Sequence, residues 1–248
     1  MLKKERQAYI MQQLNVHNKV LSSDLSVQLD VSEDTIRRDL QELADEGSVL
    51  KVHGGALSNS FHFTLQNQAV YFATEKRMIA QKALPLIHDG MFVLLSGGTT
   101  IRELVKMLPA HLNATFITPS VPIALELMNH PGSDVIFIGN KLLKSAQMSV
   151  GAEVVQKLAG VKADLCFLGT NSIHADEGIT DLEWEVIEVK KAMIRAASKV
   201  VSLAISEKLN SVQRLKVCGL DEINMLITEL DPSDQLLKPF SNKEIVVL

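Results

Sequence analysis

The chain has few of the residues that mark several common protein classes. Its 248 residues include two cysteines, Cys166 and Cys218, which are far apart and lack metal-ligand spacing, so neither a disulfide framework nor a cysteine zinc site is expected. No apolar run approaches the roughly 18 residues that cross a bilayer. The amino terminus carries charges where a secretory signal would have an apolar core. These absences predict a cytoplasmic protein with no membrane partner.

A surplus of positive charge is also absent. The chain has 25 lysines and arginines against 29 aspartates and glutamates, which gives a net charge of −4. Residues 1–57 contain seven basic and nine acidic side chains, a net charge of −2, so this part is no more basic than the rest. Composition alone therefore argues against a nucleic-acid partner. Any DNA-binding surface has to place its positive charge locally.

The first part of the chain nevertheless has the spacing of three short helices. The first is expected over residues 3–14, and the second behind Ser22 or Ser23. The third begins behind Ser32, a suitable N-cap, and Gly47 follows where a left-handed residue would end it. Three such helices with a tight turn before the last predict a helix-turn-helix, which places the start of its last helix in the major groove. The buried face of the third helix is predicted from apolar residues at helical spacing, namely Ile36, Leu40 and Leu43.

The start of the third helix and the segment behind it supply the candidate DNA contacts. Arg37 and Arg38 lie off the apolar face, where arginine can bond guanine or hold a phosphate, and the acids from Asp39 onward come where the helix can leave the DNA. Residues 49–52 alternate like a strand, and the glycine turn behind them is typical of a wing. Charge alone favours the alternative of an ordinary solvated helix, and the wing in register favours DNA binding. The predicted contacts are Ser32, Thr35, Arg37, Arg38, Lys51, His53 and Gly54.

Beyond residue 74 the pattern changes to short apolar strands that alternate with helical stretches. This alternation predicts an α/β fold with a mostly parallel sheet. The predicted organisation is a winged helix-turn-helix domain over 1–57, a linker over 58–73, and a larger α/β domain over 74–248. The expected strands lie at residues 91–96, 114–118, 135–139, 163–169, 199–205 and 223–230.

A ligand site is expected at the end of the first of these strands. In an open α/β sheet the small-molecule crevice lies beyond the carboxyl ends of the strands. The sequence SGGTT at residues 96–100 stands at such an end and opens a helix, so backbone N–H groups and hydroxyls can hold an anion. It has neither of the nucleotide-binding glycine patterns, so no nucleotide cofactor is expected. A sugar phosphate is the natural ligand, and a plain strand-to-helix turn is the alternative.

Residues 169–180 are expected to form a polar loop after an apolar strand. The helix behind this loop carries Glu185 and Lys190, which either bind a ligand or form a solvated face. Trp184, the single tryptophan, is expected to pack against other residues.

The run VSEDTIRRDLQELADEGSVLKVHGGAL, with KERQAYIMQQL and SSDLSVQL before it, resembles the winged helix-turn-helix of the DeoR family of bacterial transcriptional regulators. The resemblance continues over almost the whole chain, through the GTT loop, the EGIT segment at 177–180, Lys190 and Lys208. It implies that the third helix reads operator DNA. It also implies that the second domain, similar in fold to ribose-5-phosphate isomerase, binds phosphorylated sugars.

The chain departs from the family pattern at four positions. Asn140 and Ser172 replace glycines, and Ser96 and Ile205 stand where many members have aspartate, which removes two partners for sugar hydroxyls. The candidate effector residues, from the strand ends and from the resemblance together, are Ser96, Gly97, Gly98, Thr99, Thr100, Asn171, Gly178, Thr180, Glu185, Lys190 and Lys208.

The leading interpretation is a transcriptional repressor that binds double-stranded operator DNA as a dimer or tetramer and responds to a phosphorylated sugar. No catalytic residue, metal or cofactor is expected. The first alternative is a sugar-phosphate isomerase-like enzyme with a DNA-binding appendage, in which Glu185 acts as a base beside Lys190 or Lys208. The second alternative is a constitutive DNA-binding protein whose larger domain only mediates oligomerisation.

Overall fold

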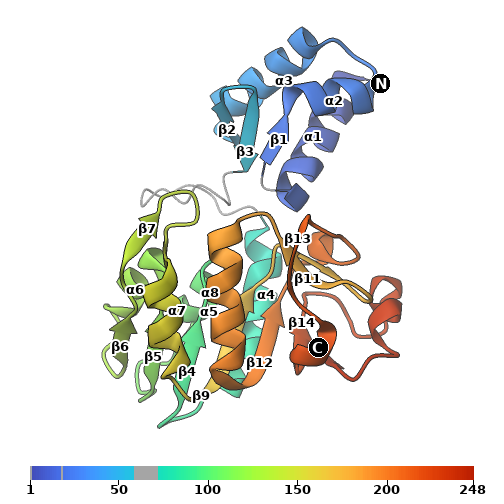
Figure 1. Cartoon of the computed structure of the whole chain (residues 1–248). Coiled ribbons are helices and arrows are strands. Elements are labelled where there is room, and N and C mark those ends of the chain that lie inside the picture. The colour runs from blue at the N-terminus through green and yellow to red at the C-terminus, as the bar shows by residue number, and fades with distance from the viewer. Residues whose placement is uncertain (1, 18, 59–71) are drawn as a thin grey trace. The chain divides into compact units, whose positions relative to one another are not determined.

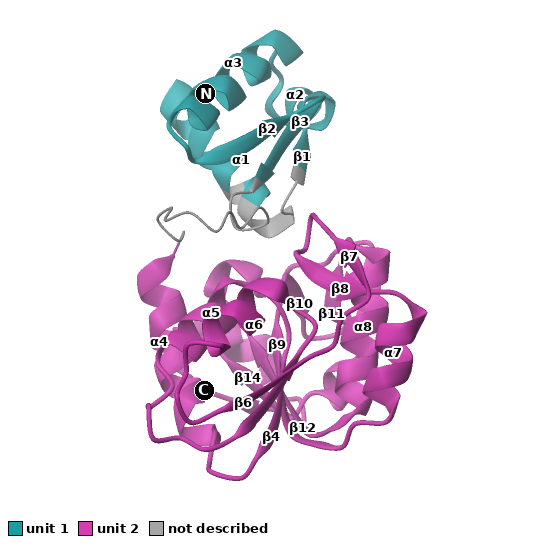
Figure 2. Ribbon diagram, turned by 90° about the vertical axis from the view of Figure 1, so that its left-hand side faces the viewer, with its two compact units in different colours: residues 1–71 teal, residues 72–248 magenta. Residues whose placement is uncertain are grey.

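The computed structural model describes residues 2–17, 19–58 and 72–248. The chain forms two compact units, residues 1–71 and 72–248 (Figures 1 and 2). The segment predicted as a linker, 58–73, lies almost entirely outside the described residues. Over the described ranges, no helix has both the length and the apolar composition needed to cross a bilayer.

The first unit, over its described residues, combines three helices with a three-stranded antiparallel sheet. A core that includes Ile10, Leu14, Leu25, Ile36 and Leu40 joins the helices to the sheet. The predicted winged helix-turn-helix is confirmed, with β2 and β3 as the wing. The elements are α1 (Lys3–His17), β1 (Lys19–Leu21), α2 (Ser22–Leu29), α3 (Glu33–Asp45), β2 (Val49–Val52) and β3 (Gly55–Ser58), with strand order β1-β3-β2.

Both ends of α3 are set by the residues that the sequence indicated. Ser32 has an extended backbone, and its Oγ accepts a hydrogen bond from the N–H of Thr35 at 3.3 Å. At the other end Gly47 has a φ of +72°, and the N–H of Ser48 donates to the carbonyl of Leu43 at 2.8 Å. This bond and the left-handed glycine form a Schellman motif, which satisfies carbonyls that the last helical turn leaves free.

Strand β1 was not predicted, and it changes how α2 begins. The chain passes directly from β1 into α2, so the N-cap position is Leu21, which makes no side-chain hydrogen bond to the helix. The prediction that Ser22 or Ser23 caps this helix is therefore wrong. Ser22 is buried as the first helical residue, and its N–H donates to the carbonyl of Gly54 in the wing at 2.8 Å.

The second unit, throughout the part described, is built on a seven-stranded sheet in which every neighbouring pair is parallel. The strand order is β15-β14-β12-β9-β4-β5-β6. Each of the six predicted apolar runs overlaps one of these strands, although β6 and β12 begin one and two residues earlier than predicted, and β15 was not predicted. The strands are β4 (Phe92–Leu95), β5 (Thr115–Thr118), β6 (Asp134–Phe137), β9 (Ala163–Gly169), β12 (Ala197–Leu203), β14 (Met225–Ile227) and β15 (Val246–Val247).

Helices cover both faces of this sheet. Helices α4 to α6 lie on one face, and α7 and α8 lie on the other (Figure 1). Alternate residues of β4 belong to different cores, because Val93 and Leu95 face α4 to α6 whereas Leu94 faces α7 and α8. The predicted α/β architecture is therefore a three-layer one. The helices are α4 (Ala73–Ala83), α5 (Thr99–Lys106), α6 (Val121–Leu127), α7 (Ala152–Ala159) and α8 (Trp184–Arg195).

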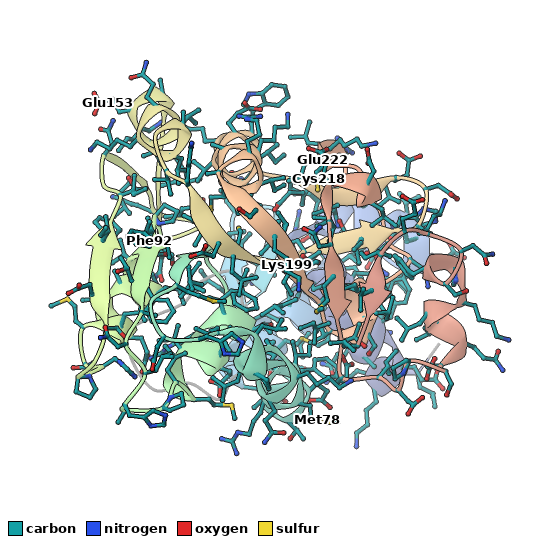
Figure 3. All side chains as sticks on the ribbon, turned by 90° about the horizontal axis from the view of Figure 1, so that it is seen from below. Met78, Phe92, Glu153, Lys199, Cys218 and Glu222 are labelled. Atoms are coloured by element: carbon teal, nitrogen blue, oxygen red, sulfur yellow. The ribbon has the colours of Figure 1, made fainter. Side chains whose placement is uncertain are left out.

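The layers are plain when the unit is seen from below. In Figure 3, Met78 on α4 and Glu153 on α7 lie on opposite sides of the sheet, and Lys199 of β12 lies between them. Short 3₁₀ helices complete the connections, namely η1 (Leu84–Leu86), η2 (Ser206–Lys208), η3 (Leu220–Glu222) and η4 (Gln235–Phe240).

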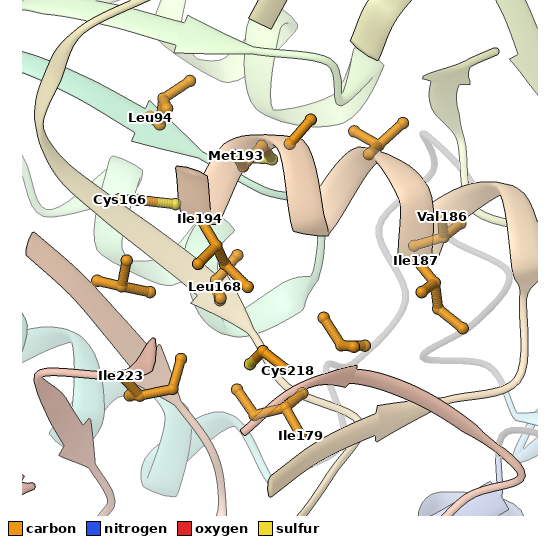
Figure 4. Close-up of a cluster of buried hydrophobic side chains, with 14 of the residues drawn as sticks. Leu94, Cys166, Leu168, Ile179, Val186, Ile187, Met193, Ile194, Cys218 and Ile223 are labelled. Atoms are coloured by element: carbon orange, nitrogen blue, oxygen red, sulfur yellow. The ribbon is translucent and has the colours of Figure 1, made fainter. Parts of the chain in front are cut away.

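Residues 169–180 are not the loop that their polarity predicted. They contain β10 (Ser172–His174) and most of β11 (Gly178–Asp181), which form a small antiparallel sheet with β13 (Leu215–Cys218). The apolar side chains of this sheet, such as Ile179, pack into the core beneath α8 (Figure 4). A separate hairpin joins β7 (Lys141–Leu143) to β8 (Met148–Val150).

Candidate DNA-binding surface and effector site

Arg37 and Arg38 are both exposed at the start of α3, but their partners differ. The Arg37 guanidinium donates to Oδ1 of Asp34 at 3.1 Å and to Oε2 of Glu33 at 2.9 Å. Among the described residues, the Arg38 guanidinium has no hydrogen-bond or ion-pair partner. Arg38 can therefore bond DNA as it stands, whereas Arg37 has to leave two carboxylates first. Ser32 and Thr35, the other predicted contacts on this helix, bond to each other through their hydroxyls at 3.0 Å.

Part of the acidic charge of α3 is neutralised within the unit. Asp39 is 2% exposed and forms an ion pair with Arg6 of α1, so it is not one of the solvated acids that the sequence indicated. Glu42 accepts hydrogen bonds from Lys3 at 2.7 Å and Gln7 at 2.9 Å. The bond from Lys3 lowers the pKa of Glu42 most strongly. Helix α1 thus compensates acids whose charge would otherwise oppose DNA binding by α3.

The wing is a two-residue hairpin between β2 and β3, with His53 and Gly54 exposed at its tip. Lys51, on β2, is tied to α3 because its Nζ donates to Oε1 of Gln41 at 2.8 Å. Gly55, expected in the turn, belongs to β3, where the backbone of β1 leaves no room for a side chain. The tip of the wing is therefore exposed to solvent, whereas Lys51 is held against α3 by its bond to Gln41.

The carboxyl ends of β4 and β9 lie at the centre of the second unit. The chain leaves β4 toward β5 and β6 and returns to β9 on the other side, so the strand order reverses between these two strands. Open α/β sheets bind ligands at such a reversal. Ser96, which is fully buried, accepts the N–H of Gly169 through its Oγ at 2.7 Å. A Cβ on Gly169 would lie 2.4 Å from the carbonyl oxygen of Gly97, so these two strand ends are in direct contact.

Ser96 therefore ties two strands together, and the candidate ligand contacts begin one residue later. Gly98 is exposed at the N-cap of α5, and Thr99 and Thr100 form its first turn. Within the described part of the chain, no side chain caps this helix. The N–H groups of its first turn are thus suited to an anion.

A buried ion pair lies beside the same strand ends. Nζ of Lys190, on α8, donates to Oδ2 of Asp181 at 2.8 Å and to the carbonyl of Gly169 at 3.0 Å. Asn171 donates to both carboxylate oxygens of Asp181 at 3.1 Å. Burial alone would raise the pKa of Asp181, but the Lys190 ammonium and the hydrogen bonds hold it below its ordinary value. Asp181 was not predicted, because it follows a segment that was interpreted as a loop.

Lys208 ends η2, just behind β12, and is 8% exposed. Its Nζ has no hydrogen-bond or ion-pair partner anywhere in the described ranges. Burial, and to a smaller extent the charge of Lys76 on α4, lower the pKa of Lys208 to about 7, although the carboxylates of Glu207 and Asp181 act to raise it. Lysine is rarely buried without a bonded partner, so an anion bound at this position would supply a partner that the described residues do not.

Thr180 and Gly178, predicted as effector contacts, serve the small sheet. Oγ1 of Thr180 accepts the N–H of Gln213 at 2.7 Å and lies 2.7 Å from the hydroxyl of Ser172. Gly178 packs directly on the backbone of Cys218. Both residues therefore stabilise the small sheet whose strand β11 ends at Asp181. Their polar groups are used within this sheet and are not directed to a ligand.

Glu185 and Trp184 lie at the start of α8. Glu185 accepts hydrogen bonds from Nζ of Lys141, on β7, at 2.9 and 3.1 Å. Trp184 is 66% exposed, so the prediction that it packs against other residues is wrong. The carboxylate of Glu185 is engaged by the hairpin and is not part of the Lys190 cluster.

Both units match described protein families. Residues 6–61 match the DeoR-like helix-turn-helix domain, and residues 72–230 match the DeoR C terminal sensor domain. The chain belongs to the DeoR family of transcriptional regulators.

Relatives of this DeoR-family chain align along almost their full length. The transcriptional repressor GlcR of Bacillus subtilis is 34% identical over 239 residues, which covers 94% of this chain and 91% of that protein. A lactose phosphotransferase system repressor of Staphylococcus epidermidis is 29% identical over 252 residues, 99% and 100% of the two chains. A solved D-ribose-5-phosphate isomerase covers 56% of this chain and 55% of its own, with 15% identity and a TM-score of 0.41.

Proposed function

We propose that this regulator is a repressor that binds operator DNA through α3 and the wing, and that a phosphorylated sugar at the carboxyl ends of β4, β9 and β12 releases it. The observation that carries the proposal is Lys208, a buried lysine just behind β12 whose Nζ has no hydrogen-bond or ion-pair partner among the described residues. The names of the relatives, which include a lactose phosphotransferase system repressor, support a sugar-linked effector.

The groups at the strand ends fit the two halves of such a ligand. The ammonium of Lys208 and the N–H groups at Gly98 to Thr100 suit a phosphate. Asp181 and Asn171 offer a carboxylate and an amide for sugar hydroxyls. Asp181 therefore supplies a carboxylate that Ser96 and Ile205 do not.

The enzyme alternative is not favoured by these contacts. An isomerase needs a carboxylate that is free to accept a proton from the substrate. Asp181 is held by Lys190, and Glu185 is held by Lys141. The alternative of a constitutive DNA-binding protein gives no reason for burying Lys208 without a partner.

Release follows from a difference in effector affinity between two states of the repressor. Operators with two-fold symmetry place half-sites about one or more helical turns apart, so we expect a homodimer or tetramer with a fixed spacing of its DNA-binding units. An effector that binds more tightly to a state with another spacing shifts the population away from DNA.

The test uses the full chain and a DNA duplex selected by the chain from a random library. Fluorescence anisotropy of the labelled duplex should show that at least one sugar phosphate weakens binding tenfold or more, while the unphosphorylated sugar has no effect. A sugar phosphate that the chain binds without any change in DNA affinity would contradict the coupling. A chain that prefers no sequence over random duplex would contradict the regulator itself.

A further inference from the structure

The seven-stranded sheet of the second unit ends at β6, a strand that pairs on one side only. Within the described residues its neighbour in the sheet is β5, and in Figure 1 β6 lies at the outer border of the sheet. An open edge of this kind presents backbone N–H and C=O groups to any further strand. Most edge strands are therefore short, charged, bulged or covered, and an edge without these features is a candidate interaction surface.

Strand β6 has few of the features that keep an edge from pairing. Its four residues, Asp134–Phe137, contain one charge, at the first position, and no proline. Its register with β5 is continuous, so no bulge turns the edge away. The strand at the opposite edge, β15, is only two residues long and follows the charged residues Lys243 and Glu244. The β6 edge is thus the longer and the less protected of the two.

The backbone of β6 presents two of its residues to the open edge. The N–H of Asp134 donates to the carbonyl of Ala114, next to β5, at 3.1 Å, so Asp134 faces β5. Backbone groups of successive strand residues point to alternate sides, so Ile136 faces β5 as well. The N–H and C=O groups of Val135 and Phe137 therefore point away from the sheet.

Apolar side chains are exposed along the same edge. Ile136 and Phe137 are 46% and 44% exposed, although both are large and lie in a strand. Helix α6, which packs against β6, and its C-cap add the exposed residues Leu125 and Met128, three positions apart on one side of the helix. Exposed apolar side chains that lie together commonly mark a protein–protein interface. The β6 edge thus offers a further strand both backbone hydrogen bonds and an apolar surface.

We infer that β6 pairs with β6 of a second copy of the chain, antiparallel about a two-fold axis that passes beside Ile136. In this register Val135 of each copy lies opposite Phe137 of the other, and the two residues exchange both of their outward N–H···O bonds. The side chains of Ile136 from the two copies meet at the axis, where the strands approach most closely. The sheets of the two copies then form one continuous sheet.

The β6 edge is complementary to itself, which favours a second copy over an unrelated strand. Its two outward residues stand symmetrically about Ile136, so a two-fold axis matches donor to acceptor in both directions. The charge of Asp134 does not oppose this pairing, because the two carboxylates are four residues apart, about 14 Å along the strands, where salt screens exposed charges. Two-fold symmetry is also what an operator with two half-sites requires. In this respect the inference rests on the proposed function, and it assigns the surface of the homodimer expected there.

Sedimentation velocity of the full chain over a range of concentrations measures the association without DNA. Ile136→Lys places two like charges opposite each other at the axis, so it should weaken the association by about tenfold or more. A wild-type dimer should then dissociate to monomers, and a wild-type tetramer to dimers. Val246→Lys is the matched control, because it places the same charge on an exposed residue of the other edge strand, and it should associate as wild type does.

A mixture of two variants tests the register. Ile136→Lys and Ile136→Glu chains should each associate weakly alone, whereas an equimolar mixture should form mixed dimers, because opposite charges then meet at the axis. This recovery also shows that both variants fold. A monomeric wild-type chain, equal association of Ile136→Lys and wild type, or no gain on mixing would overturn the pairing of β6. Operator binding by the wild-type chain and its response to sugar phosphates judge the proposed function separately, since neither measurement depends on which surface joins the copies.

Discussion

At the scale of single residues, the two neighbouring arginines of α3 have different tasks. Arg37 is held by Glu33 and Asp34 on its own helix, and Arg38 has no such partner among the residues described. A DNA contact by Arg37 requires the loss of two charge-assisted bonds, whereas a contact by Arg38 requires none.

We expect Arg38→Ala to weaken operator binding by about 10- to 100-fold, the usual loss for a bidentate or phosphate contact of arginine. Arg37→Ala should have a smaller effect, because the bonds that it makes to DNA replace bonds within the helix. Fluorescence anisotropy with the selected operator measures both. Arg195→Ala, an exposed arginine of the sensor unit, is the control. Equal losses in the two α3 variants would contradict this assignment.

Two ion pairs of the sensor unit allow a matched comparison of burial. Lys190–Asp181 is buried, and Lys243–Asp176 has an exposed carboxylate. Asp181→Asn leaves a buried ammonium without its charge partner, so the free energy of unfolding should fall by roughly 3 kcal/mol. Asp176→Asn should leave it almost unchanged, because solvent screens this exposed pair. Urea denaturation of the two variants provides the measurement, and similar losses would mean that Asp181 is not an essential counter-ion.

At the scale of elements, the two ends of α3 are set by Ser32 and Gly47, which flank the helix. Gly47 holds the left-handed conformation that ends the helix, and alanine there costs about 1 kcal/mol. We expect Gly47→Ala to raise the amide hydrogen exchange of α3 about fivefold in the full chain. Gly160→Ala is a suitable control, because Gly160 ends α7 with a φ of −87°. Unchanged exchange in α3 would show that its end does not depend on the glycine.

The sequence predicted correctly those elements whose apolar spacing or capping residues are sufficient to identify them. The predicted strand at 163–169 has the same limits as β9, and Ser32 and Gly47 lie at the two ends of α3 as expected. The prediction of a loop at 169–180 was wrong because the polar side chains of Ser172 and Thr180 are buried against each other. The order of polar residues along the chain does not show that two of them will pair.

The same contrast holds for the candidate site. Resemblance indicated Lys190 and Lys208, and the structure places both near the ends of β9 and β12. Asp181 could not be selected from the sequence, since its position in the site depends on Lys190 and Asn171 of other elements. Ser96 was selected as a ligand contact, but its hydroxyl holds Gly169, and only the contact between β4 and β9 reveals this.

At the scale of the whole molecule, the buried lysines should make stability depend on pH. The folded-state pKa values of Lys76 and Lys208, about 8 and about 7, lie below the ordinary 10.5. Between about pH 7 and pH 10 the unfolded chain therefore binds more protons than the folded chain, and stability rises with pH. Below pH 7 both states are protonated, and these groups add no further slope.

Calorimetry in buffers without multivalent anions should show a melting temperature that rises by about 5 °C between pH 7 and pH 9. Lys208→Met should reduce this slope, because it removes the group with the larger shift. A melting temperature that falls over this range in the wild-type chain would contradict the buried-cation account.

The internal pairing of Arg37 also has a consequence for how the regulator is distributed in a cell. A genome offers roughly 10⁶ to 10⁹ competing sites, and affinity for them comes from the number of phosphates that a protein neutralises. A DNA-binding unit with a net charge of −2 over residues 1–57, and with one of its predicted recognition arginines already paired, is expected to hold random duplex weakly. We then expect few copies to be sequestered on the chromosome, so that a small pool would suffice to keep an operator filled.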